Sequence, residues 1–117
     1  MIKKVVFITG ASRGIGLATV KKFILEGWYV AGFYNQNPGP DVKNCRWYQL
    51  ELSDPENISF SFSKAYKNFG QINCLVNNAG IFGYKNLAEY DEKLIDRVIA
   101  INEKGTYLAT QAVLDKM

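Results

Sequence analysis

Short apolar runs alternate with helical patterns along this chain of 117 residues. Runs rich in β-branched and aromatic residues predict strands over residues 5–8, 28–34, 45–52 and 72–77. Apolar positions three or four residues apart predict helices over residues 15–26, 55–69 and from 91 onward. Strands that alternate with helices form a parallel sheet covered on both faces, so the pattern predicts an α/β fold. In a doubly wound sheet the strand order would be 3-2-1-4.

Local signals mark the ends of the predicted helices. Gly27 and Gly70 each follow an apolar helical pattern, as glycines that end helices do. Asp54 is the expected N-cap of the second helix, because the residue before a proline avoids the helical conformation. Pro55 then suits the first helical position.

The last helical pattern carries an interruption. Leu94, Val98 and Ile101 form one apolar stripe, but Asn102 and Gly105 follow it. Both residue types are unfavourable in a helix interior. The sequence therefore predicts a kink or a break between two helices at this point.

A glycine-rich turn joins the first strand to the first helix. Gly10, Gly14 and Gly16 surround the polar pair Ser12-Arg13, and the helical pattern begins at once. Glycine accepts positive φ angles and lets a ligand approach the backbone closely. A helix start offers unpaired N–H groups and the positive end of its dipole to an anion. This order predicts a phosphate-binding turn, and a tight turn without a ligand is the alternative.

Three motifs resemble those of the short-chain dehydrogenase/reductase family. Thr9-Gly10-Ala11-Ser12-Arg13-Gly14-Ile15-Gly16 is similar to the family's opening motif, Asn77-Asn78-Ala79-Gly80 to its second signature, and Ile101-Asn102-Glu103-Lys104-Gly105-Thr106 to its third. The resemblance implies a Rossmann-type doubly wound parallel sheet, of which residues 1–117 would form the amino-terminal half as one incomplete domain. The 3-oxoacyl-acyl-carrier-protein reductase branch looks most similar.

The resemblance also implies which residues bind a dinucleotide. The strand end at Glu51-Leu52 would touch the adenine, Asn78-Ala79-Gly80 would line the ribose, and Asn77 would brace the central sheet. The expected cofactor-binding residues are Gly10, Ser12, Arg13, Gly14, Ile15, Gly16, Asn35, Glu51, Leu52, Asn78, Ala79 and Gly80.

The end of the second strand indicates which dinucleotide binds. A site that prefers NAD places Asp or Glu there, on the ribose 2′-hydroxyl, whereas this chain has Tyr34-Asn35-Gln36. That stretch contains no carboxylate to repel a 2′-phosphate, and Arg13 would pair with such a phosphate. Family members with a basic residue at this position tend to use NADP, so we expect NADPH as the cofactor. A solvent-exposed loop arginine is the alternative for Arg13.

By the same resemblance, Asn102 would take part in catalysis by holding a water that relays protons to a lysine. Hydride transfer in the family uses a serine and a Tyr-x-x-x-Lys pair, in which the lysine lowers the pKa of the tyrosine, the general acid. None of the seven tyrosines of this chain has a lysine four residues later. We therefore expect the chain alone to be inactive, and a helix-breaking residue without chemistry is the alternative for Asn102.

Composition and charge exclude several classes of function. Fourteen basic and eleven acidic residues give a net charge of +3 without a block of like charge, which favours neither nucleic acid nor an anionic membrane as a partner. No apolar run approaches the ~20 residues of a membrane span, and we expect a cytoplasmic protein. The chain has no histidine, which excludes a Ser-His-Asp triad and a His-ligated metal site.

The predicted topology separates the two cysteines and exposes one strand. Cys45 and Cys74 would lie three strand spacings apart, ~14 Å, which is too far for a disulfide. Leu75-Val76 in the fourth strand would form an apolar edge that invites pairing with another chain. We therefore expect a homo-oligomer, formed through this edge or through the final helix, residues 103–116.

Two functions are consistent with these patterns. The first is an NADP-dependent oxidoreductase that transfers a hydride between NADPH and a small carbonyl or alcohol substrate, here as a truncated chain without the catalytic Ser, Tyr and Lys. The second is a non-catalytic module or subunit that binds NADP. Nucleotide binding by the purified chain would distinguish a folded module from a fragment.

Overall fold

A parallel sheet of four strands forms the centre of the molecule, in the order β3-β2-β1-β4. The computed structural model describes residues 3–81 and 86–117. The strands span Val5–Ile8 (β1), Tyr29–Tyr34 (β2), Cys45–Gln49 (β3) and Cys74–Val76 (β4). The helices span Gly14–Leu25 (α1), Pro55–Phe69 (α2), Glu92–Ile99 (α3) and Gly105–Leu114 (α4), with a 3-10 helix at Leu87–Glu89 and a π-helix at Ala100–Lys104. The predicted α/β fold and strand order are confirmed.

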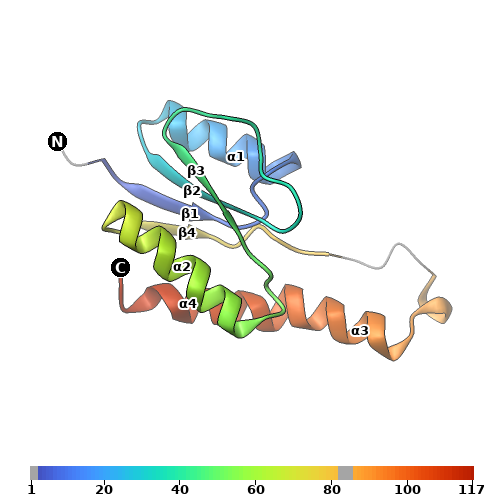
Figure 1. Cartoon of the computed structure of the whole chain (residues 1–117). Helices are drawn as coiled ribbons and strands as arrows, with labels where there is room; N and C mark the ends of the chain where they lie inside the picture. Colours follow the sequence, from blue (N-terminus) through green and yellow to red (C-terminus); the bar gives the residue numbers. More distant parts are fainter. Residues whose placement is uncertain (1–2, 82–85) are drawn as a thin grey trace.

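Alternate residues of β1 face two separate cores. Val6 and Ile8 pack with Val20 of α1, whereas Val5 and Phe7 belong to the core that α2 and α4 cover. This alternation follows from the period of two along a strand. Figure 1 shows α1 on one side of the sheet and α2 with α4 on the other. All of β1 is buried, as expected for a strand covered on both faces.

The predicted ends of α2 are confirmed at both signals. The Asp54 carboxylate accepts hydrogen bonds from the backbone N–H groups of Glu56 and Asn57, so Asp54 caps α2 ahead of Pro55. Gly70 ends α2 with a φ of +79°, the left-handed conformation that favours glycine.

Three strands are shorter than the apolar runs that predicted them. β2 begins at Tyr29, β3 ends at Gln49, and β4 covers only Cys74–Val76. After Gln49 the chain leaves the sheet, yet Leu52 is 7% exposed and packs in the core beneath α2 and α4. Leu50 and Leu52, past the end of β3, are therefore apolar because helices cover them, and their pattern in the sequence resembles the continuation of a strand.

The predicted interruption near Asn102 is a π-helix, and the predicted break between two helices is wrong. The π-helix joins α3 to α4, and the backbone is helical at both junctions. Figure 1 shows the two helices running end to end. A π-turn accommodates an extra residue without ending the helix. Gly105 is needed there because a β-carbon at this position would lie 2.9 Å from the Leu52 Cβ.

β4 lies at one edge of the sheet, as predicted, and its residues are half-buried. Self-association through this edge, or through the final helix, stays a prediction. Cys45 and Cys74 are free thiols on opposite edge strands, as expected, and burial raises the pKa of Cys45 to about 12. Within residues 3–81 and 86–117, no helix has the length and apolar character to cross a bilayer.

Candidate functional site

The glycine turn follows the carboxyl end of β1 and leads into α1. Gly10 and Gly14 have φ angles of +60° and +58°, a conformation that favours glycine. A β-carbon on Gly10 would lie 2.8 Å from the Ala79 Cα, and one on Gly16 would lie 2.0 Å from the Gly10 carbonyl oxygen. Gly14, in contrast, faces open space. The first and third glycines thus close the turn against its neighbours, and Gly14 leaves room for a ligand.

The start of α1 is suited to an anion. Arg13 is the N-cap residue, with an extended backbone, an exposed side chain and no side-chain capping bond. The first turn of α1 contains no acidic residue that would compensate the positive end of the helix dipole. Ile15, in that turn, is 79% exposed, while Ser12 before it is half-buried. The backbone N–H groups of this turn are therefore available to a phosphate group.

Thr9 and Asn78 tie the glycine turn to the end of β4. The Thr9 hydroxyl oxygen accepts hydrogen bonds from the N–H groups of Asn78, at 3.1 Å, and Ala79, at 3.0 Å. In return the Asn78 side-chain amide donates to the carbonyl oxygens of Thr9, at 3.2 Å, and Gly10, at 2.9 Å. These bonds cross between β1 and β4, where the winding of the sheet reverses and α/β folds bind their ligands.

This arrangement corrects the role expected of Asn77. Asn78, rather than Asn77, braces the centre of the sheet, whereas the Asn77 amide donates to the Thr110 hydroxyl on α4 at 3.1 Å. The two neighbouring side chains point to opposite sides of the chain, as they do along a strand. Thr9, which is 1% exposed, was not among the expected site residues, although a polar residue directly after an apolar strand was a signal for it.

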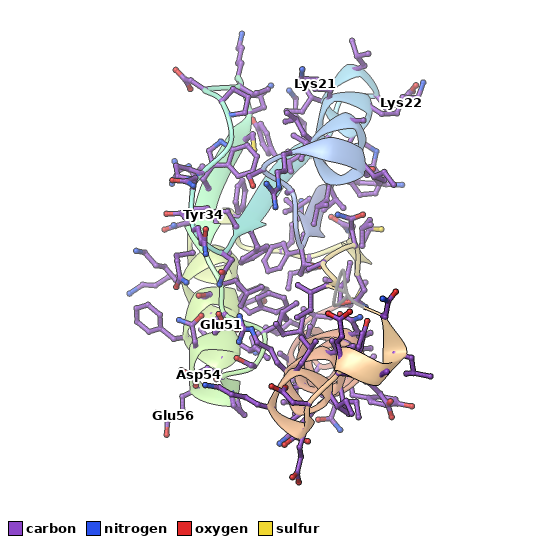
Figure 2. The ribbon with its side chains drawn as sticks, turned by 90° about the vertical axis from the view of Figure 1, so that its right-hand side faces the viewer. Lys21, Lys22, Tyr34, Glu51, Asp54 and Glu56 are labelled. Carbon is purple, nitrogen blue, oxygen red and sulfur yellow. The ribbon has the colours of Figure 1, made fainter. Side chains whose placement is uncertain are left out.

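A second group of polar side chains joins the ends of β2 and β3. The Asn35 amide donates to the Glu51 carboxylate at 2.8 Å and to the Leu50 carbonyl at 3.4 Å. The other carboxylate oxygen of Glu51 accepts from the Ser53 hydroxyl at 2.6 Å, and Arg97 of α3 lies 3.6 Å from Glu51. Figure 2 faces this edge of the molecule and shows Tyr34 and Glu51 on it.

Glu51 brings a negative charge beside the end of β2. Burial, the largest single influence, would raise the pKa of Glu51, but the hydrogen bonds from Ser53 and Asn35 and the charge of Arg97 together lower it. Glu51 is therefore ionised at neutral pH. Residues 34–36 contain no carboxylate, as the sequence indicated, but the segment after the neighbouring strand supplies one.

Leu52, expected with Glu51 at the adenine, turns its side chain away from this edge. Its side chain is buried in the core, next to Gly105 of α4. Only the backbone of Leu52 remains for a ligand at this edge.

Asn102 lies in the π-helix, and its side chain is bonded to the chain after β4. Its carbonyl oxygen accepts from the Ile81 N–H at 2.7 Å, and its amide donates to the Ile81 carbonyl at 2.5 Å. A β-carbon on Gly80 would lie 3.3 Å from the same Asn102 oxygen. Asn102 thus holds the segment that contains Gly80 close to the helix. Its side-chain amide bonds both backbone groups of Ile81, as the backbone of a neighbouring strand would.

Replacing Asn102 with alanine should loosen this segment. Loss of two hydrogen bonds lowers the free energy of unfolding by about 2 kcal/mol, and the Ile81 amide should exchange its hydrogen faster. Hydrogen exchange and urea denaturation measure both effects. Glu103→Ala, at an exposed position of the same π-helix, serves as the control. An unchanged exchange rate at Ile81 in Asn102→Ala would contradict the bonding described here.

Parallel strands bring the expected residues to one edge of the sheet. The glycine turn lies against Asn78 and Ala79, and Asn35 lies against Glu51. Gly80 lies instead beside Asn102. A left-handed glycine with open space, an uncompensated helix start and a reversal of winding at the same edge fit a dinucleotide.

Comparison with known proteins agrees with this geometry. Residues 4–117 match the sequence profile of the short chain dehydrogenase family. The chain is 37% identical to 3-oxoacyl-acyl-carrier-protein reductase of Thermotoga maritima over 97% of its length, and 34% identical to human hydroxysteroid dehydrogenase-like protein 2 over 93%.

Solved structures show the same fold. The 3-ketoacyl-acyl-carrier-protein reductase of Brucella melitensis, complexed with NADH, covers 99% of the chain with a TM-score of 0.90 and 26% identity. A blue fluorescent protein from a metagenomic library, in complex with NADPH, covers 97% with a TM-score of 0.85 and 29% identity. The match takes up 51% of each of these two structures.

The chain spans 50% of the Thermotoga reductase and 30% of the human relative. The profile match nevertheless extends over nearly every residue, and it contains the glycine turn, the Asn78 brace and Asn102. The Rossmann-type sheet of the solved structures is the sheet described above. The chain therefore belongs to the short-chain dehydrogenase family.

Proposed function

We propose that the chain forms the dinucleotide-binding part of an NADP-dependent oxidoreductase. One observation carries this proposal: the glycine turn, closed by Gly10 and Gly16, presents the uncompensated start of α1 at the point where the winding of the sheet reverses. The NADH and NADPH complexes of similar proteins support a dinucleotide at this edge.

Each part of the site takes a part of the dinucleotide in this proposal. The N–H groups of Gly14, Ile15 and Gly16 bind the pyrophosphate, with Ser12 beside them. Arg13 pairs with the 2′-phosphate, next to Asn35. Glu51 and the backbone of Leu52 contact the adenine. The ribose is contacted by Asn78, Ala79 and Gly80.

The chemistry is the transfer of a hydride, which the bound nicotinamide supplies or receives, between the dinucleotide and a small carbonyl or alcohol substrate. The residues of this chain bind and orient the dinucleotide, and Asn102 holds the segment at Gly80 and Ile81 beside it. None of the 117 residues forms a Tyr-x-x-x-Lys pair. We place the general acid in residues outside this chain, and we expect the chain alone to bind NADPH without turnover.

Titration of the purified chain with NADPH and NADH tests the proposal. Arg13→Ala should lower the affinity for NADPH about tenfold or more, because an arginine–phosphate pair is lost. The affinity for NADH should stay nearly unchanged. Lys21→Ala is the matched control, because it removes one positive charge from an exposed position of α1. NADPH fluorescence and calorimetry measure the two affinities.

Two results would count against parts of this proposal. If the wild-type chain binds neither dinucleotide, the assigned function is wrong. If both dinucleotides bind and Arg13→Ala lowers the two affinities equally, the site is retained but Arg13 does not recognise the 2′-phosphate.

A further inference from the structure

Glu51 creates a problem for the binding of a 2′-phosphate. Its carboxylate is fixed on the Asn35 amide at 2.8 Å, directly after β2, where dinucleotide-binding folds read the ribose 2′ position. A 2′-phosphate carries a charge of about −1.5 to −2. An ionised Glu51 at this place, taken alone, disfavours NADP for the same reason that an Asp or Glu at the end of β2 does.

Arg97 supplies the opposite charge. Its guanidinium lies 3.6 Å from the Glu51 carboxylate that bonds to Asn35, and it comes from α3, outside the three sequence motifs. Among the residues that the structure describes, Arg97 is the only cation in an ion pair with Glu51. The Glu51 side chain is 27% exposed, so water screens the pair incompletely.

We propose that Arg97 is a specificity-determining residue, which permits a 2′-phosphate by balancing the charge of Glu51 beside Asn35. Arg97 contacts neither the phosphate nor the adenine in this proposal, and acts through Glu51. The inference rests on the proposed function, because it assumes that a dinucleotide occupies the carboxyl edge of the sheet.

The pair has little reason to exist for stability alone. An exposed ion pair typically contributes little to the free energy of unfolding, and Arg97 is 50% exposed. Its field at a doubly charged phosphate several ångströms away is a separate effect. Coulomb's law with a water-like dielectric gives about a fivefold change in affinity for the removal of one charge at that range.

Two fragments of the cofactor isolate this effect. Adenosine 2′,5′-bisphosphate and adenosine 5′-monophosphate differ only in the 2′-phosphate, and neither needs the nicotinamide end of the site. The ratio of their dissociation constants therefore measures discrimination at the 2′ position. A change in fold or in adenine contacts would weaken the binding of both fragments and leave the ratio of their dissociation constants unchanged.

Isothermal titration calorimetry on four forms of the chain tests the proposal. Arg97→Ala should lower the preference for the bisphosphate about fivefold, and Glu51→Gln, which keeps an oxygen facing Asn35, should raise it by a similar factor. The double variant should return close to the wild-type ratio, because its local charge is again balanced. The shift in Arg97→Ala should also shrink at high salt.

Two further variants separate charge from structure. Lys93→Ala removes one positive charge from an exposed position of α3 and should leave the ratio unchanged. Arg97→Lys keeps the charge and should stay within about twofold of wild type. This comparison, together with Arg97→Gln, also replaces Arg97→Ala if the alanine variant does not fold.

The outcomes distinguish this inference from the proposed function. If the wild-type chain binds neither fragment, the proposed function is wrong and the inference with it. If both fragments bind and the ratio is the same in Arg97→Ala, or does not recover in the double variant, the inference alone is overturned.

Discussion

Replacing Gly16 with alanine should abolish dinucleotide binding and destabilise the fold. The new β-carbon would lie 2.0 Å from the Gly10 carbonyl oxygen and 2.7 Å from the Asn78 amide nitrogen, and the first contact involves backbone that cannot rotate away. Overpacking of this kind costs about 3 kcal/mol. The glycine turn must also move, which would remove two or more of the charge-assisted hydrogen bonds proposed for the phosphate, so affinity should fall about 100-fold or more.

Gly27→Ala provides the matched control at the other end of α1. Gly27 has a φ of +89° and no atom within 4 Å of its would-be β-carbon, so alanine there costs only about 1 kcal/mol of backbone strain. NADPH affinity should be unchanged in this variant. Calorimetric titration and urea denaturation of both variants provide the comparison. Wild-type affinity in Gly16→Ala would show that the described packing of the turn is incorrect.

Phe62→Ala should remove a large share of the stability of the fold. Phe62 is 1% exposed on α2, and its ring centroid lies 4.7 Å from that of Phe33 and 5.5 Å from that of Phe7. Truncation of a buried phenylalanine costs about 3–5 kcal/mol. Small domains have total stabilities of about 5–15 kcal/mol, so this variant should be partly unfolded at moderate urea.

Phe60 on the same helix tests whether the effect belongs to burial. It is 65% exposed, and its replacement by alanine should change the free energy of unfolding by no more than about 0.5 kcal/mol. Circular dichroism during urea denaturation measures both variants. Similar losses at the two positions would mean that α2 does not present Phe62 to the sheet.

The sequence predicted the local features of this protein well. Asp54 before Pro55 and Gly70 after α2 act within one helical turn, so their effect does not depend on the rest of the fold. The order of strands and helices followed from periodicity in the same way. The glycine turn was found because its spacing and its place after a buried strand are properties of neighbouring residues.

Contacts between strands were harder to foresee. Glu51 and Asn35 are far apart in the sequence, and residues 34–36 alone indicated an edge without a carboxylate. Parallel pairing of β2 with β3 places the two side chains 2.8 Å apart and changes the charge at the site. Arg97 lies on α3, which follows α2 and β4 along the chain. It joins this group only because α3 passes the same edge of the sheet.

The sequence by itself determined the α/β class, the helix ends and the place of the glycine-rich turn, because these depend on residues within a few positions of one another. Only the tertiary structure decided that Asn78 rather than Asn77 braces the sheet, and that a π-helix rather than a break carries Asn102 to Ile81. The same holds for the charge balance of Glu51 and Arg97. These features depend on which backbones and side chains meet after the sheet and its helices have packed, and local propensity does not contain that information.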